Sequence, residues 1–160
     1  MKIIIFICCF VFCGCGFYNN SFKPEVLAEK KILSSRKAEI VQNGKVVMVV
    51  IATYLNNVNP DIYNTREYFF IEVFSELDIP LIYYMTFSIT NNERFLWIRE
   101  VDKDEFDDVL NVSNKWSKGF LIAFDDIDEY DKKNMKLNLV VDTIGEMNFD
   151  FTYEVFEMQL

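Results

Sequence analysis

The sequence predicts an all-β fold, an antiparallel sandwich of about seven to eight strands preceded by a short N-terminal helix. After residue 37, apolar and polar side chains alternate with a period of two along much of the chain, which is typical of strands with one buried face. The strand candidates recur at fairly even spacing with turn residues between them, as in sandwiches and barrels. The aromatic content of 16% supplies large side chains for an apolar core.

The expected elements begin with a helix over 24–34, because Pro24 and Glu25 suit a helix N-terminus. Asn43-Gly44 is a turn signal. The first long strand is almost wholly apolar, so we expect it to be central and buried on both faces. Strands are predicted over 45–55, 68–75, 81–90, 94–101, 120–124, 135–141 and 149–155.

Immunoglobulin-like Greek-key packing of two sheets is the first choice for these strands. A closed meander β-barrel with a ligand cavity is the alternative. Within 81–90, the alternation places Leu81, Tyr83 and Met85 on one inward face. No repeat or linker divides residues 24–160, so we expect a single β-rich domain.

The N-terminus has the pattern of an export signal, with Lys2, an apolar run of about eleven residues and a small residue before Cys15. The run is shorter than the ~20 residues that a membrane-spanning helix needs, so an uncleaved anchor is the less favoured alternative. The end of the segment, Phe12-Cys13-Gly14-Cys15, resembles the lipobox of bacterial lipoproteins, although Phe12 and Cys13 depart from its usual residues.

The lipobox resemblance implies a signal peptide over 1–14, lipid such as palmitate on Cys15 and a lipidated tether over 15–23. It places the protein in the cell envelope, anchored to a membrane through Cys15. The outer membrane is favoured if the host has one, because Gly16 replaces the aspartate that often signals inner-membrane retention. No cysteine follows Cys15, so a disulfide framework in the folded domain is excluded.

The composition argues against most kinds of chemistry. Histidine is absent, which removes the commonest general base and metal ligand, and no glycine-rich phosphate loop occurs. We therefore expect neither an enzyme nor a cofactor. Residues 100–160 carry sixteen acidic and six basic side chains, a net charge of −10, which disfavours nucleic-acid binding.

The acidic run at 125–131 is the best metal candidate. Asp126, Asp128 and Asp131 could supply oxygen ligands to calcium, but their spacing is not that of an EF-hand. A solvated loop between strands is the favoured interpretation.

Aromatic side chains form the candidate interaction patch. Tyr68, Phe70 and Phe74 share the face opposite Phe69, and Tyr84 is expected on a similar outer face. An open patch would indicate a partner, glycan or lipid contact. Cover by another element, such as the helix over 24–34, is the favoured alternative.

The resulting functional expectation is a non-catalytic binding or structural module that contacts another envelope protein. The alternative is a carrier of an apolar ligand held inside a barrel or an opened sandwich. Four basic residues near the anchor (Lys30, Lys31, Arg36 and Lys37) could touch anionic headgroups, although ordinary solvation is favoured.

Overall fold

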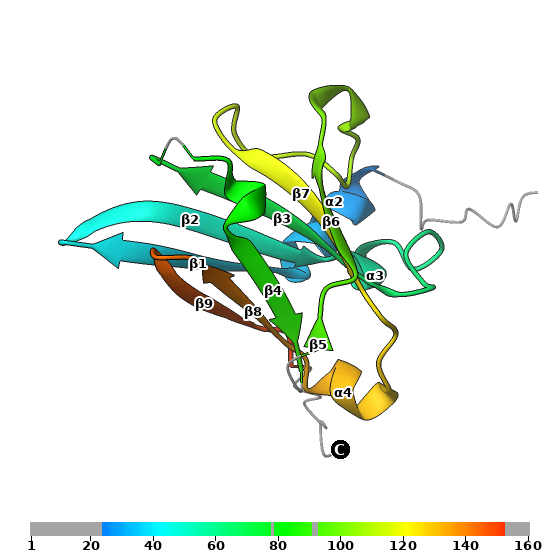
Figure 1. Cartoon of the computed structure of the whole chain (residues 1–160). Helices are drawn as coiled ribbons and strands as arrows, with labels where there is room; N and C mark the ends of the chain where they lie inside the picture. The colour runs from blue at the N-terminus through cyan, green and yellow to red at the C-terminus, as the bar shows by residue number, and fades with distance from the viewer. Residues whose placement is uncertain (1–23, 78, 91–92, 153–160) are drawn as a thin grey trace, which may run out of the picture.

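The computed structural model describes residues 24–77, 79–90 and 93–152. In this part of the chain, two antiparallel sheets stack as a sandwich (Figure 1). Sheet A has the order β1-β2-β3-β7-β6, with bounds Ser35–Gln42, Lys45–Tyr54, Glu67–Ser75, Lys118–Phe124 and Trp97–Val101. Sheet B has the order β5-β4-β8-β9, with bounds Glu93–Arg94, Met85–Ile89, Lys136–Val141 and Gly145–Asp150.

The strand order is that of an immunoglobulin domain. If β2 to β9 are read as A, B, C, C′, D, E, F and G, the two sheets become A-B-E-D and C′-C-F-G. Strand β1 is an additional edge strand of sheet A that pairs with β2, the strand read as A. The predicted all-β sandwich with immunoglobulin-like packing and a short N-terminal helix is therefore confirmed, and the sheets do not close into a meander barrel.

The space between the sheets is filled by side chains that the period-two pattern points inward. Phe69 and Ile71 of β3 and Phe87 of β4 belong to one buried cluster, and each is fully buried. The Phe69 ring lies 5.2, 5.7 and 5.4 Å from the rings of Tyr54, Phe124 and Phe151, measured between centroids. Aromatic packing thus occupies the centre of the sandwich.

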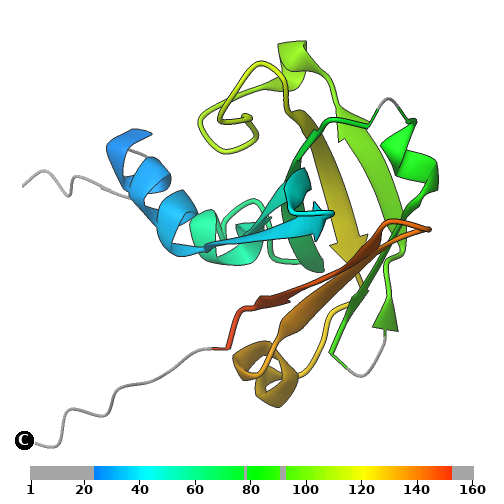
Figure 2. The ribbon, with the colours of Figure 1, turned by 90° about the vertical axis from the view of Figure 1, so that its left-hand side faces the viewer.

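A second apolar layer covers part of the outer face of sheet A. Helix α2 (Pro24–Leu33), helix α3 (Leu55–Val58) and the segment 102–117 lie on this side (Figure 2). Leu27 and Leu55 cluster there with Phe70 and Leu121. At Gly119, an added Cβ would lie 2.8 Å from the Phe70 ring, so this close approach requires glycine.

The expectation that the strand over 45–55 is buried on both faces is wrong. Strand β2 lies next to the edge strand β1, and its outward Val47, Val49 and Ile51 are half-buried. Strand β3 occupies the middle of sheet A and is covered on both sides over most of its length.

The β1–β2 hairpin turns at the predicted dipeptide. Asn43 and Gly44 have φ values of 52° and 76°, as a type I′ turn requires. The two sheets touch along β1 and β9, where Gln42 Nε2 donates to the Ile144 carbonyl at 3.0 Å. One edge of the sandwich is therefore held together by side chains.

The segment 81–90 begins differently from its predicted strand. Leu81–Tyr83 form the 3₁₀ turn η2 after Pro80, and β4 starts at Met85. Tyr83, expected on the inward face, is 84% exposed, because the turn breaks the alternation before the strand begins. The other short helices are η3 (Lys103–Glu105) and α4 (Glu129–Lys133).

Several predicted features lie outside the described residues. These are the signal peptide over 1–14, the lipidation site Cys15, the tether over 15–23 and the last three residues of the strand over 149–155. Among the helices of the described ranges, none has the length and hydrophobicity to cross a membrane.

Truncation of Phe69 tests the importance of the central aromatic packing. Phe69→Ala should lower the free energy of unfolding by about 3–5 kcal/mol, because it removes a fully buried ring and leaves a cavity. Urea denaturation measures this loss. Ile62→Ala is the control, since Ile62 is 65% exposed and should change stability by no more than about 0.5 kcal/mol. Equal effects of the two substitutions would contradict the packing argument.

Candidate functional site

A groove crosses the outer face of sheet A between α2 and the segment 111–117. It consists of two adjoining hollows of about 390 and 250 Å³ that share Ile51, Glu72 and Ser113. The strand register sets its floor, since Ile51 of β2 lies between Lys37 of β1 and Glu72 of β3. In the neighbouring rows, Val49 pairs with Phe74 and Thr53 pairs with Phe70. The floor is therefore mostly apolar.

Two exposed apolar side chains line the groove on opposite sides. Ile32 of α2 is 74% exposed, and Trp116 is 71% exposed. A local turn holds Trp116 in place, because Asn114 Oδ1 accepts hydrogen bonds from the N–H groups of Trp116 and Ser117. Lys115 Nζ lies 4.6 Å from the centroid of the indole ring, as in a cation–π contact.

Most polar groups of the groove are satisfied within the protein. Lys31 Nζ donates to both the carbonyl and the Oδ1 oxygen of Asn111, each at 2.8 Å. Ser35 and Thr53 share a hydrogen bond between their hydroxyls at 2.7 Å. Burial lowers the pKa of the Lys31 ammonium, although the negative charges of Glu72 and Asp107 act in the opposite direction.

Glu72 is the buried charge at the centre of the groove, with 6% of its surface exposed. Its Oε1 accepts from the backbone N–H of Ser113 at 2.8 Å and from the Ser113 hydroxyl at 2.6 Å. Among the described residues, Oε2 has no hydrogen-bond partner and is not sealed from solvent. Lys37 Nζ likewise has no ion pair or hydrogen bond within the described ranges. The groove thus has an open carboxylate oxygen and an open ammonium.

The candidate aromatic patch is divided by the fold. Phe70 is 1% exposed beneath the second apolar layer, which is the cover that the sequence favoured. Tyr68 packs against Tyr63 and Trp97, with ring centroids 5.5 and 6.3 Å away. Phe74 lines the groove, whereas Tyr84 precedes β4 in the other sheet. The four residues do not form one exposed surface.

The basic cluster near the proposed anchor is also divided. Lys31 is bonded to Asn111, and Arg36 Nε donates to the Asp150 carbonyl at 2.8 Å. The Arg36 guanidinium lies 5.5 Å from the centroid of the Phe151 ring. Two of the four basic side chains therefore bind the protein itself, and Lys30 and Lys37 remain for other contacts.

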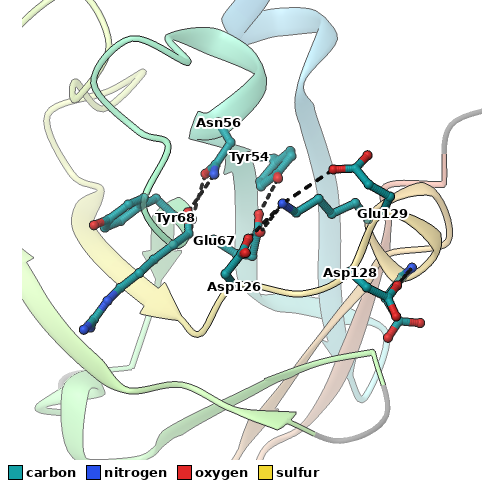
Figure 3. A network of polar contacts seen from close by, with 10 residues as sticks. Tyr54, Asn56, Glu67, Tyr68, Asp126, Asp128 and Glu129 are labelled. Carbon is teal, nitrogen blue, oxygen red and sulfur yellow. Dashed lines mark hydrogen bonds and ion pairs between the residues drawn. The ribbon is translucent and has the colours of Figure 1, made fainter.

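A second polar site lies on the inward face of sheet A, beside α4 (Figure 3). Glu67 begins β3 and is fully buried. The Tyr54 hydroxyl donates to Glu67 Oε2. Lys132 Nζ lies 3.3 Å from Oε1 as an ion pair without hydrogen-bond alignment, and it also contacts Asp126 Oδ1 at 2.8 Å. Lys132 thus joins the buried carboxyl to an exposed one.

The electrostatics of this second site follow from burial. Burial raises the pKa of the Glu67 carboxyl, and the hydrogen bond from Tyr54 and the charge of Lys132 oppose this only in part. The hydrogen bond from Lys132 lowers the pKa of Asp126. Burial and the bond to Glu67 raise the pKa of the Tyr54 hydroxyl, which stays protonated as a donor.

The acidic run contributes to this site through structural contacts. Asp126 pairs with Lys132, and Asp128 Oδ1 accepts from the Asp131 backbone N–H at 2.8 Å as the N-cap of α4. Lys132 also lies 3.9 Å from Glu129. Within the ranges that the structure describes, no three acidic, cysteine or histidine side chains converge to hold a metal ion.

Comparison with known proteins assigns no relative: no protein-family model, no curated protein and no solved structure matches this chain. The site must therefore be interpreted from its own geometry.

Glu72 was missed as a site residue from the sequence alone. It stands between Ile71 and Val73 in a strand that is otherwise apolar and aromatic, Tyr68 to Phe74. An acidic residue in such a strand indicates a buried charge with a specific partner, since an unpaired buried carboxylate is costly. The sequence could not identify Ser113 as that partner, because 41 residues separate the two.

The raised pKa of Glu67 predicts a pH-dependent stability. The folded protein binds the proton of the Glu67 carboxyl more tightly than the unfolded chain does. The stabilisation that comes from this protonation is complete below pH 4.5, and it is lost as the pH rises through the raised pKa. Glu67→Gln cannot titrate and should remove this fall in the free energy of unfolding. Urea denaturation from pH 4.5 to neutrality measures it. The exposed Glu146→Gln is the control and should keep the wild-type profile. A profile that Glu67→Gln leaves unchanged would refute the assignment.

Proposed function

We propose that the chain is a non-catalytic binding module of the bacterial cell envelope, held on a membrane by lipid on Cys15. In this proposal the groove on sheet A binds a partner protein of the envelope. The groove carries the proposal, because its exposed Ile32 and Trp116 flank an apolar floor that stays accessible. Concave apolar surfaces with few open polar groups are typical of binding sites.

The tether supports a membrane-proximal position for this groove. Eight residues separate Cys15 from Pro24, where α2 begins, and such a segment spans at most about 30 Å. Ile32 lies near the other end of α2, a ten-residue helix about 15 Å long. The partner would therefore be reached close to the lipid surface.

A carrier of an apolar ligand is the second candidate function. The large buried side chains between the sheets leave the interior filled, so cargo would occupy the outer groove. The apolar floor at Val49, Ile51 and Phe74 offers such cargo a surface to pack against, which favours this alternative. Saturable fluorescence of an apolar probe, lost in Ile51→Lys, would identify a carrier; a protein-binding module would give no saturable signal.

Substitution of the anchor residue tests the membrane attachment. In a bacterial host, the wild-type protein should have a mass equal to residues 16–160 plus an acylated Cys15, and should sediment with membranes. Cys15→Ala should lose the acyl mass and the cleavage, because the modified thiol is gone. Intact-mass analysis measures both changes, with Cys13→Ala as the matched control that keeps the lipid. An unmodified full-length wild-type mass would refute the lipid anchor.

A photoreactive residue at position 116 tests the groove. Incorporated in place of Trp116, it should give a defined crosslinked product with a protein of the envelope, because that side chain lies beside the groove and is 71% exposed. The same residue in place of Tyr83, which is 84% exposed but far from the groove in the fold, should not give that product. Gel mobility and mass spectrometry identify the product. Identical products from both positions would contradict a specific site.

A further inference from the structure

The chemistry of the groove narrows the class of partner. Lys31, Ser35, Thr53, Ser113 and Asn114 all have hydrogen bonds within the protein. Among the charged side chains of the groove in the described residues, the open atoms are Glu72 Oε2 inside the groove and Lys37 Nζ at its β1 side. An occupant must therefore offer a hydrogen-bond donor to a buried carboxylate and an apolar body to the floor.

A cationic donor meets the requirement of Glu72 better than a neutral one. A cationic donor adds a Coulombic attraction to the hydrogen bond with a carboxylate, and this attraction is stronger where little water screens it. Burial removes water from the carboxylate, so a cation that replaces water also offsets the charge. Lys31 does not fill this role in the described structure, because its ammonium is bonded to Asn111 and no ion pair joins it to Glu72.

The walls of the groove suit an arginine side chain. Trp116 presents an indole ring beside the hollow that contains Glu72 and Phe74. A planar guanidinium stacks on aromatic faces and donates from a rigid fork, while its methylene stem covers apolar surface. Ile51 and Val49 provide that surface on β2.

The charges around the groove restrict a bound cation to the position of Glu72. On the outer face of β1, Lys37 and Glu39 stand two residues apart and carry opposite charges. Besides Glu72, the charged side chains that line the groove are Lys31 and Lys37, and Lys115 and Lys118 flank Trp116 in the sequence. The attraction of the groove for a cation therefore comes from the carboxylate of Glu72 and not from the surrounding surface.

We propose that the groove binds an extended segment of the partner protein, with one arginine side chain donating to Glu72 Oε2 beside Trp116. This inference rests on the proposed function of the groove and specifies its occupant. The arginine stem lies over Ile51, and flanking apolar residues of the segment contact Phe74 and Ile32.

Matched peptides test this occupant on the full chain held in phosphatidylcholine vesicles. The first is a capped pentapeptide with a central arginine between two isoleucines; the second has citrulline, a neutral isostere, in place of arginine; the third has glutamate. Trp97→Phe leaves Trp116 as the single tryptophan of the chain, so its fluorescence reports binding at the groove. The arginine peptide should saturate the signal, and the citrulline peptide should bind about ten- to a hundredfold more weakly.

Glu72→Gln in the same background should remove the preference for arginine, because the glutamine keeps an acceptor for Ser113 but has no charge. Glu76→Gln is the matched control, since Glu76 is exposed on β3's C-terminal side and outside the groove. That variant should retain the wild-type preference. The comparison of arginine with citrulline on the unsubstituted Glu72 protein stands even if Glu72→Gln fails to fold.

The outcomes separate this inference from the proposed function. Equal binding of the arginine and citrulline peptides, or tighter binding of the glutamate peptide through Lys37, overturns the arginine at Glu72 and keeps the groove as a binding site. No peptide binding together with a crosslink at position 116 overturns the arginine at Glu72 alone. No peptide binding and no crosslink overturns both.

Discussion

Two buried carboxylates on strand β3 hold the irregular parts of this protein against its sheet. Glu67 and Glu72 lie five positions apart, so the alternation of the strand places them on opposite faces. Glu67 is inward and contacts Tyr54 and Lys132, the latter from α4. Glu72 is outward and receives two hydrogen bonds from Ser113 in the segment 111–117. Each carboxylate thus holds in place one segment outside the sheets: Glu67 holds α4, and Glu72 holds the segment 111–117.

Aromatic packing between the sheets explains why an immunoglobulin-like strand order can form here without a disulfide that joins them. The folded domain has no cysteine, and its two sheets share a core rich in phenylalanine. Several of the largest buried side chains lie on the strands that pair in the middle of sheet A, among them Phe69 on β3 and Phe124 on β7. Burial of such rings supplies the stabilisation that a crosslink would otherwise contribute.

The same two acidic residues differ in what they leave open. The oxygens of Glu67 face Tyr54 and Lys132 inside the protein, and the residue is fully enclosed. Glu72 lines the groove and uses one oxygen for Ser113, and its other oxygen has no hydrogen-bond partner among the described residues. A structural role explains Glu67 completely, whereas Glu72 combines a structural contact with an open acceptor. Only the second is therefore available to a ligand.

The sequence predicts the architecture better than the site. Alternation along β3, β4 and β8 depends on local residue type, so the strands, the sandwich class and the Asn43-Gly44 turn could be predicted. The error at Tyr83 arose because Pro80 starts a 3₁₀ turn, and a turn of three residues can imitate strand periodicity. The groove depends on how segments that are distant in the sequence pack over the outer face of sheet A. Contacts such as Glu72 with Ser113, 41 residues apart, leave no local pattern.

A groove of this size places a limit on affinity that membrane attachment can offset. Stable protein interfaces bury about 1,600 Å² in total, far more than a single extended segment over two small hollows provides. Binding through Glu72 and Trp116 alone should thus be weak and readily reversible. A lipid on Cys15 would confine the domain to the membrane surface, and a partner in the same membrane would meet it at a high effective concentration. In the proposed arrangement, the tether and the groove on α2's side of sheet A would act together, because the anchor would supply the proximity that the contact area lacks.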